Sequence, residues 1–114
     1  MRITRTDISM VRGDSEYILV TCTDSEGLPR PFVDGDTVYF TVKEATTKDT
    51  KILQKIVTVF EEDGTALIEI APEDTKELKY REYVYDVQLT ETTGRITTIV
   101  RPSKFVIEGE VTYE

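Results

Sequence analysis

The stretch EYVYDVQLT, residues 82–90, decides the fold class, because apolar and polar side chains alternate along it. Its two sets of side chains are Tyr83, Tyr85, Val87 and Leu89 on one side, and Asp86, Gln88 and Thr90 on the other. An extended chain places alternate residues on opposite faces, so one face is predicted to be buried and the other to contact water. This pattern is typical of a strand in an antiparallel sheet.

Six further segments are rich in β-branched and aromatic residues, and one N-terminal segment shows the pattern more weakly. They are residues 17–23, 37–43, 52–61, 65–71, 95–101 and 104–113, with 2–10 as the weaker candidate. The sequences EEDGT (61–65) and TETTGR (90–95) predict hairpin turns, and Pro102 is expected to separate the last two strands. Strands at this spacing predict an all-β fold. We expect one domain, residues 1–114, built as an antiparallel immunoglobulin-like β-sandwich of about seven or eight strands.

The apolar side of each strand gives a predicted core. Its members are Ile18, Val20, Val38, Phe40, Val42, Ile68, Ile70, Tyr85, Val87, Leu89 and Phe105. Cys22 also lies among apolar residues, and we interpret it as a small core residue.

The segment APEDTKELKY, residues 71–80, interrupts the strand pattern. Pro72 suits the first position of a helix and acidic residues follow it, so one short helical turn is predicted. An acidic helical turn before a strand that begins Tyr-x-Tyr is the layout of a tyrosine corner in immunoglobulin-like sandwiches. Tyr83 is the candidate corner residue, whose hydroxyl would bond back to the upstream backbone.

Two short stretches, VRGDSEYI (11–18) and VDGDTVYF (33–40), share a glycine-aspartate pair. Glycine accepts a positive φ, and the aspartate can bond N–H groups that a turn leaves unpaired. The predicted structural turn residues are Gly13, Asp14, Gly35 and Asp36. Arg-Gly-Asp-Ser is also an adhesion-type sequence, so an adhesive loop is the alternative. Because Asp34 occupies the place of Arg12 in the second turn, Arg12 is expected to be dispensable for stability.

The composition argues against several functions. The chain has no His and one Cys, which excludes Ser-His-Asp and Cys-His catalysis and imidazole-ligated zinc sites. A net charge of −8 makes nucleic-acid binding unlikely, since such a surface repels phosphate. No segment has the ~20 apolar residues of a membrane span, so no membrane contact is expected. The N-terminus has no apolar core of a signal peptide, and synthesis in the cytoplasm is expected.

Acidic and aromatic residues are the groups of this chain that could bind a ligand. The candidates for calcium ligands are Asp24, Glu26, Asp34 and Asp36, and those for paired catalytic carboxylates are Glu69, Asp86 and Glu108. The former lack EF-hand spacing and the latter lie on predicted wet faces. We therefore expect no enzyme activity, no cofactor and no metal site. The tyrosines that could stack on a carbohydrate are Tyr17, Tyr39, Tyr80, Tyr83, Tyr85 and Tyr113, but core or cross-strand packing is the preferred interpretation.

Five motifs occur in order along most of the chain: RGDSEYI, DGDTVYFTVK, APEDTKEL, YVYDVQLT and GRITTIVRPSKFVIEGEVT. In this order the chain resembles small phage and prophage virion proteins of Gram-positive hosts, similar to the N-terminal domain of phage baseplate upper proteins. The resemblance implies a non-enzymatic tail or baseplate module, located in the virion, that contacts other virion proteins or copies of itself. The alternative is a ligand-binding or adhesion module that recognises a host-surface glycan or protein through its loops.

Overall fold

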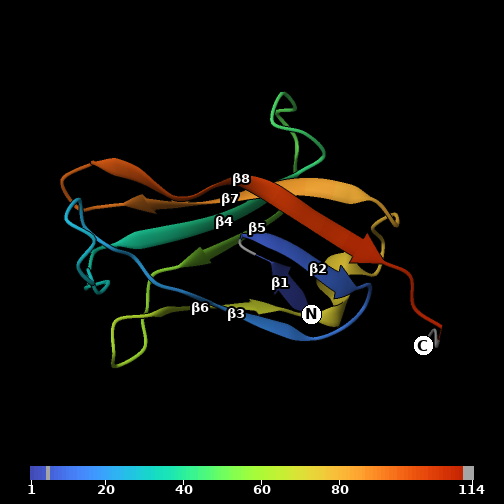
Figure 1. The fold of residues 1–114 in the computed structure, drawn as a ribbon, viewed down its shortest axis with the longest axis horizontal. Helices are drawn as coiled ribbons and strands as arrows, with labels where there is room; N and C mark the ends of the chain where they lie inside the picture. The colour runs from blue at the N-terminus through green and yellow to red at the C-terminus, as the bar shows by residue number, and fades with distance from the viewer. Residues whose placement is uncertain (5, 112–114) are drawn as a thin grey trace.

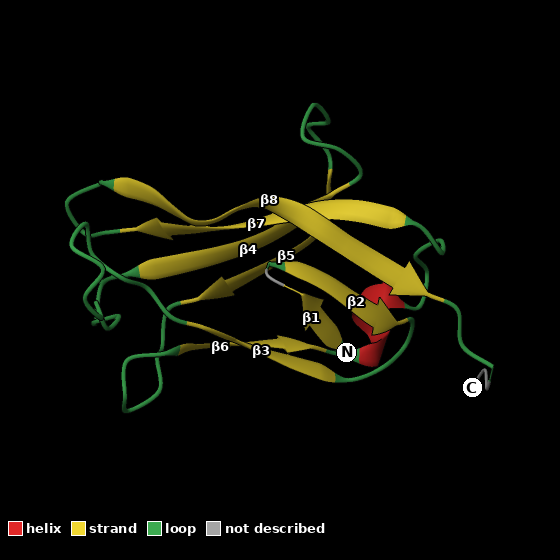
Figure 2. Ribbon diagram, viewed as in Figure 1, coloured by secondary structure: helices red, strands yellow, loops and turns green. Residues whose placement is uncertain are grey.

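The expected strands form two layers in the computed structural model, which describes residues 1–4 and 6–111 (Figures 1 and 2). The strands are β1 (Arg2–Thr4), β2 (Asp7–Val11), β3 (Glu16–Val20), β4 (Thr37–Lys43), β5 (Lys51–Val57), β6 (Ala66–Ile70), β7 (Glu82–Thr90) and β8 (Ile96–Glu108), and the helical turn is α1 (Pro72–Thr75). The prediction of an all-β chain with one short helical turn is therefore confirmed.

One layer is a six-stranded sheet in the order β1-β2-β8-β7-β4-β5, and the other is the pair β3-β6. Figure 1 shows β3 and β6 side by side beneath the larger sheet. The expectation of wholly antiparallel sheets is wrong at one place, because β2 and β8 pair in parallel. The physical reason is that alternating side chains reveal which face of a strand is buried but not the direction in which the strand runs.

The core lies between the layers, and all eleven side chains predicted to be inside are buried. Strands β4 and β7 contribute most regularly, since every second residue of each is buried. The further buried apolar residues are Ile8, Met10, Phe32, Ala66, Tyr83 and Ile107. Cys22 is only half-buried and packs against the core from its rim. Burial raises the pKa of its thiol, so the reactive thiolate is disfavoured.

Several predicted boundaries differ from the structure. Residues 2–10 form two strands that pair as a hairpin, and the strands predicted at 17–23 and 52–61 end earlier, at Val20 and Val57. Residues 96–101 and 104–108 belong to one continuous strand, so the expected break at Pro102 is wrong. The register between β7 and β8 shifts around this position, and a bulge tolerates proline because no ladder hydrogen bond needs its missing N–H. The end of the predicted segment 104–113, including Tyr113, lies outside the described residues.

The helical turn α1 follows its predicted local chemistry. Pro72 occupies the first turn, and the Asp74 carboxylate accepts the backbone N–H of Ala71 at 2.7 Å. The same carboxylate forms an ion pair with Lys55 of β5 at 2.8 Å. Asp74 therefore closes the start of α1 and attaches it to the edge of the large sheet. Within the described residues, no helix is long and apolar enough to cross a membrane.

Replacing Phe40 with Ala is expected to lower the free energy of unfolding by about 3–5 kcal/mol, because it leaves a cavity at the centre of the core. Phe40 is 0% exposed, whereas the control residue Val59 is 84% exposed. Val59→Ala should change stability by no more than about 0.5 kcal/mol. Urea unfolding followed by circular dichroism measures both, and a loss below about 1 kcal/mol for Phe40→Ala would contradict its central place.

Candidate functional site

The turn between β2 and β3 contains the Arg-Gly-Asp-Ser sequence and packs against α1. Gly13 has a φ of +85°, and its N–H donates to the hydroxyl of Thr75 at 2.8 Å. The N–H of Asp14 donates to the carbonyl of Val11 at 3.2 Å, which closes the turn. Among residues 1–4 and 6–111, the Asp14 carboxylate makes no hydrogen bond. Here the hydroxyl of Thr75, rather than the aspartate, binds the N–H group of the turn.

Arg12 connects three segments that are far apart in the sequence. Its guanidinium binds both carboxylate oxygens of Glu110, at 2.7 and 3.1 Å, just after β8. It also donates to the Leu78 carbonyl at 3.2 Å and to the Tyr80 hydroxyl at 2.6 Å. The guanidinium carbon lies 4.2 Å from the centre of the Tyr80 ring, a cation–π contact. The Arg12 hydrogen bond is the main cause that lowers the pKa of Glu110.

These contacts correct the expectation that Arg12 is a dispensable surface residue. Asp34 and Arg12 occupy matching positions in the two turns, but their neighbours differ, so the second turn does not predict the role of Arg12. An adhesive Arg-Gly-Asp loop would present its guanidinium to a receptor, whereas here the group is held within the protein. The structure therefore favours the turn over the adhesive loop.

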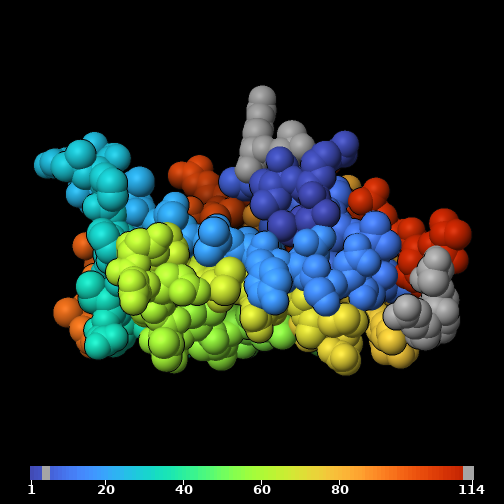
Figure 3. Space-filling view, turned by 90° about the horizontal axis from the view of Figure 1, so that it is seen from below, coloured from blue at the N-terminus to red at the C-terminus, as the bar shows by residue number. Residues whose placement is uncertain are grey.

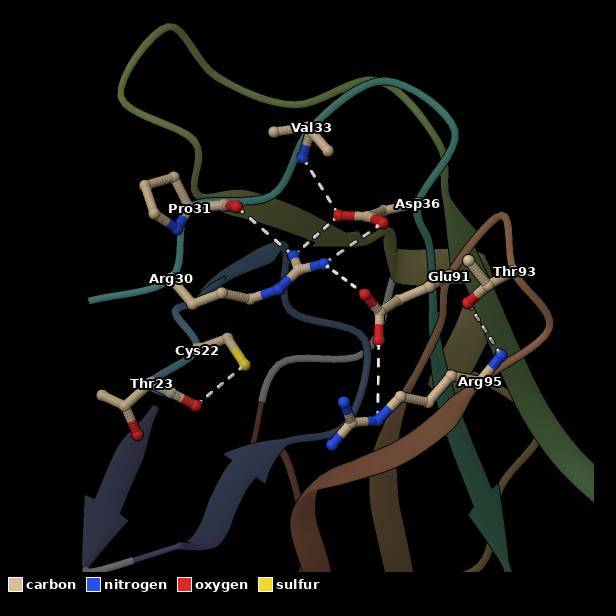
Figure 4. A network of polar contacts seen from close by, with 9 residues as sticks. All are labelled: Cys22, Thr23, Arg30, Pro31, Val33, Asp36, Glu91, Thr93 and Arg95. Atoms are coloured by element: carbon tan, nitrogen blue, oxygen red, sulfur yellow. Dashed lines mark hydrogen bonds and ion pairs between the residues drawn. The ribbon is translucent and has the colours of Figure 1, made fainter. Parts of the chain in front are cut away.

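The second turn carries a different network (Figure 4), and it lies at the opposite end of the molecule from the first (Figure 1). Gly35 has a φ of +97°, and a Cβ there would lie 2.3 Å from the methyl group of Thr92. The Asp36 carboxylate accepts the N–H of Val33 at 3.0 Å and binds the Arg30 guanidinium at 2.7 Å. Asp36 is 3% exposed, so this ion pair is largely shielded from water on the carboxylate side. The Arg30 hydrogen bond, more than any other cause, holds the pKa of Asp36 below its usual value.

Arg30 also joins the loop before β4 to the hairpin between β7 and β8. Its guanidinium binds Glu91 at 3.0 Å, and Glu91 in turn lies 3.8 Å from Arg95 (Figure 4). Sequence reasoning missed both arginine networks, because each includes a contact between residues 61 or more positions apart, although the Arg30–Asp36 pair itself spans only six. Nothing in the local pattern around Arg30 distinguishes it from an ordinary loop arginine.

Two of the four loop acids weighed as calcium ligands, Asp24 and Asp36, have structural partners. Asp24 accepts the N–H groups of Glu26 and Leu28 at 2.9 and 3.0 Å, and Asp36 is paired with Arg30. In the part of the chain that the structure describes, no group of three or more Cys, Asp or Glu residues is placed to hold a metal ion. The three carboxylates considered and not expected to be catalytic, Glu69, Asp86 and Glu108, lie on three different strands.

Tyr83 is buried and closes the loop that leads from α1 to β7. Its hydroxyl donates to the carbonyl of Lys79 and accepts the N–H of the same residue, both at 3.1 Å. The Arg81 guanidinium carbon lies 5.3 Å from the centre of its ring. A tyrosine at the start of a strand that bonds to the backbone a few residues upstream is the arrangement of a tyrosine corner.

Two surfaces are candidates for binding. The first, here called the β3 face, is the outer face of the β3-β6 layer, and its members are Tyr17, Leu19, Leu67 and Glu69. Figure 3 views the molecule from this side. Tyr17 and Leu19 are 59% and 65% exposed. A large apolar residue at two successive outward positions is unusual for a sheet face that contacts only water.

The second surface is a trough of about 420 Å³ on the opposite side of the molecule. It lies on the outer face of the six-stranded sheet, over β4, β5 and β7. The loop between β4 and β5 rises beside it, away from the β3-β6 layer (Figure 1). Its lining is mostly polar, in contrast to the β3 face.

Comparisons with protein-family models, with curated proteins and with solved structures find no match to this chain.

Arg12→Ala is expected to lower the melting temperature by several degrees, because it removes a forked carboxylate pair, a carbonyl hydrogen bond and a cation–π contact together. Arg12→Lys should give an intermediate value, since lysine keeps the charge but not the planar fork. The control is Arg101→Ala, an exposed arginine on β8. Differential scanning fluorimetry measures all three, and equal melting temperatures for Arg12→Ala and the native chain would contradict the assigned role.

The Asp36–Arg30 pair predicts a specific pH dependence. The folded-state pKa of Asp36 lies below its unfolded value, so its stabilisation is present above about pH 4 and is lost as the pH falls through the folded pKa. Asp36→Asn should lose about 1–3 kcal/mol at neutral pH and show a shallower decline towards about pH 3. Urea unfolding at several pH values measures the free energy of unfolding of Asp36→Asn. The control is Asp34→Asn, because Asp34 is an exposed aspartate of the same turn. An equally steep acid decline in Asp36→Asn would show that another group is responsible.

Proposed function

We propose that the chain is a non-enzymatic assembly module that acts through protein–protein contacts, as a structural protein of a phage tail or baseplate in the virion. The proposal rests mainly on the exposed apolar side chains of the β3 face, Tyr17 and Leu19. The partner surface belongs to another virion protein or to a second copy of the chain. The ordered motifs of the sequence, which resemble virion proteins, supply the biological setting.

Strand β3 is apolar on both of its faces. Ile18 and Val20 point into the core, whereas Tyr17 and Leu19 point away from it. Strands that are covered on both sides read as continuous apolar runs, and strands with one wet face alternate. Leu67 of β6 lies directly opposite Leu19 of β3, and it extends the apolar surface across the layer. The composition of β3 is therefore that of a strand with a partner on its outer side.

The free edge of β3 supports the same conclusion. Edge strands of soluble proteins are commonly protected by a short length, by lysine or by proline. Strand β1 has three residues, and β5 carries Lys55, which is bound to Asp74. Strand β3 has five residues, Glu16–Val20, and neither lysine nor proline. Among the described strands it pairs only with β6, so its other edge can accept an added strand.

We further propose that the two layers form an immunoglobulin-like sandwich. Two features support this finer description: a small layer packed against a larger sheet, and the Tyr83 hydroxyl bound to the backbone four residues upstream. This architecture commonly serves as a rigid scaffold whose faces and loops carry recognition.

The proposal is tested in virions purified from the phage or prophage that encodes the chain. The chain is expected to co-sediment with the particles, and Leu19→Glu should reduce its incorporation at least about tenfold, because a charge at the centre of a contact is desolvated without a partner. The matched control is Ile96→Glu, at a 64% exposed apolar residue of β8. Both variants are checked for native melting temperature. Absence of the chain from the particles, or equal loss in both variants, would contradict the proposal.

A further inference from the structure

The trough on the six-stranded sheet is built from three cross-strand rows of side chains. The central row runs from Gln54 of β5 through Thr41 of β4 to Asp86 of β7. Tyr39 and Gln88 are paired in the row on one side, and Lys51 and Lys43 in the row on the other. Because outward residues of adjacent strands stand directly opposite one another, this placement is fixed by the sheet and not by a mobile loop.

A bulge between β7 and β8 lies within the trough. The pairing of β7 with β8 skips from Tyr85↔Ser103 to Val87↔Val100, so Asp86 lies where the ladder is interrupted. Pro102 on β8 stands at the same interruption and lines the trough. Bulges re-aim side chains and are frequent beside functional sites. The interruption therefore lies within the trough, with Asp86 of β7 and Pro102 of β8 both in its lining.

Asp86 is a half-buried carboxylate whose charge is opposed by that of Lys43. Among the described residues it forms neither a hydrogen bond nor an ion pair within 4 Å. Burial raises its pKa, while the charge of Lys43 acts in the opposite direction. A partly desolvated carboxylate is stabilised by O–H or N–H donors, and the free energy gained is larger than for a neutral acceptor. The trough thus contains an acceptor that a ligand can satisfy.

The neighbours of Asp86 limit the kind of donor. The lining carries both signs of charge, so a charged ligand meets a like charge in either case: Lys43 and Lys51 for a cation, Asp86 for an anion. A neutral ligand with several hydroxyl groups avoids both conflicts. Its hydroxyls can donate to Asp86, while the Gln88 amide offers both a donor and an acceptor. The Tyr39 ring supplies an apolar surface beside these groups.

We propose that this trough binds a neutral saccharide, with its hydroxyls on Asp86 and Gln88 and a face of the sugar ring on Tyr39. The inference does not depend on the assembly function, because the trough and the β3 face lie on opposite sides of the molecule. It describes a second, ligand-binding surface on the same domain.

The test is a titration followed by ¹H–¹⁵N correlation spectra, with methyl glucoside, methyl galactoside and N-acetylglucosamine as separate probes. A single sugar ring should bind in the millimolar range, so each probe is taken to about 50 mM. Shift changes are expected at residues 39–43 and 84–90. Asp86→Asn should weaken binding at least about tenfold, and Gln88→Ala and Tyr39→Ala should weaken it as well.

Glu69→Gln is the matched control, because it neutralises an exposed carboxylate on the β3 face and should leave the titration unchanged. Preserved dispersion of each variant spectrum shows that the fold is intact. Two further probes, glycerol phosphate and lysine methyl ester, test the charged alternatives. Binding of either in place of the sugars, shift changes outside the trough, or no response to any sugar would overturn the proposal. Leu19→Glu should bind the sugar normally, which separates this result from failure of assembly.

Discussion

The contact among the aromatic rings of Phe40, Tyr85 and Phe105 holds the structure together. The ring centres lie 5.1, 6.0 and 6.1 Å apart, with edge-on or tilted geometry that aromatic pairs prefer. Each ring comes from a different strand of the large sheet, so the cluster joins β4, β7 and β8 on their inner side. Burial raises the pKa of Tyr85 to about 12, which keeps its hydroxyl protonated as a donor to the Thr6 carbonyl. The cluster thus also attaches the N-terminal hairpin.

Because the inner faces are filled by this core, recognition is left to the outer faces and edges. The two outer faces differ in chemistry: β3 presents Tyr17 and Leu19, whereas β7 presents Asp86 and Gln88. The arginine networks at the two ends serve a different purpose. Arg12 and Arg30 hold the loops in place, which leaves the sheet surfaces as the parts of the molecule available to partners.

The sequence predicted what depends on local pattern. Every residue of β4 and β7 that the alternation placed in the core is buried. The composition of residues 71–80 predicted the turn α1. It did not predict the parallel pairing of β2 with β8, because alternation carries no information about strand direction. It did not predict the continuity of β8 through Pro102, because a proline at a bulge and a proline at a strand break look alike in the sequence. The arginine networks and the trough escaped for a related reason. Each brings together residues that are far apart in the sequence, as Arg30 with Glu91 and Thr41 with Asp86 show.

Native-state hydrogen exchange tests most directly whether β4, β7 and β8 form one cooperative centre around the aromatic cluster. The amides of Val87 and of the middle of β4 should exchange only through global unfolding, with the same free energy as denaturant unfolding. The amides of β1 and of the outer edge of β5 should exchange with lower free energies, by local opening. Exchange of the Val87 amide as fast as that of the β5 edge would contradict the central place assigned to the cluster.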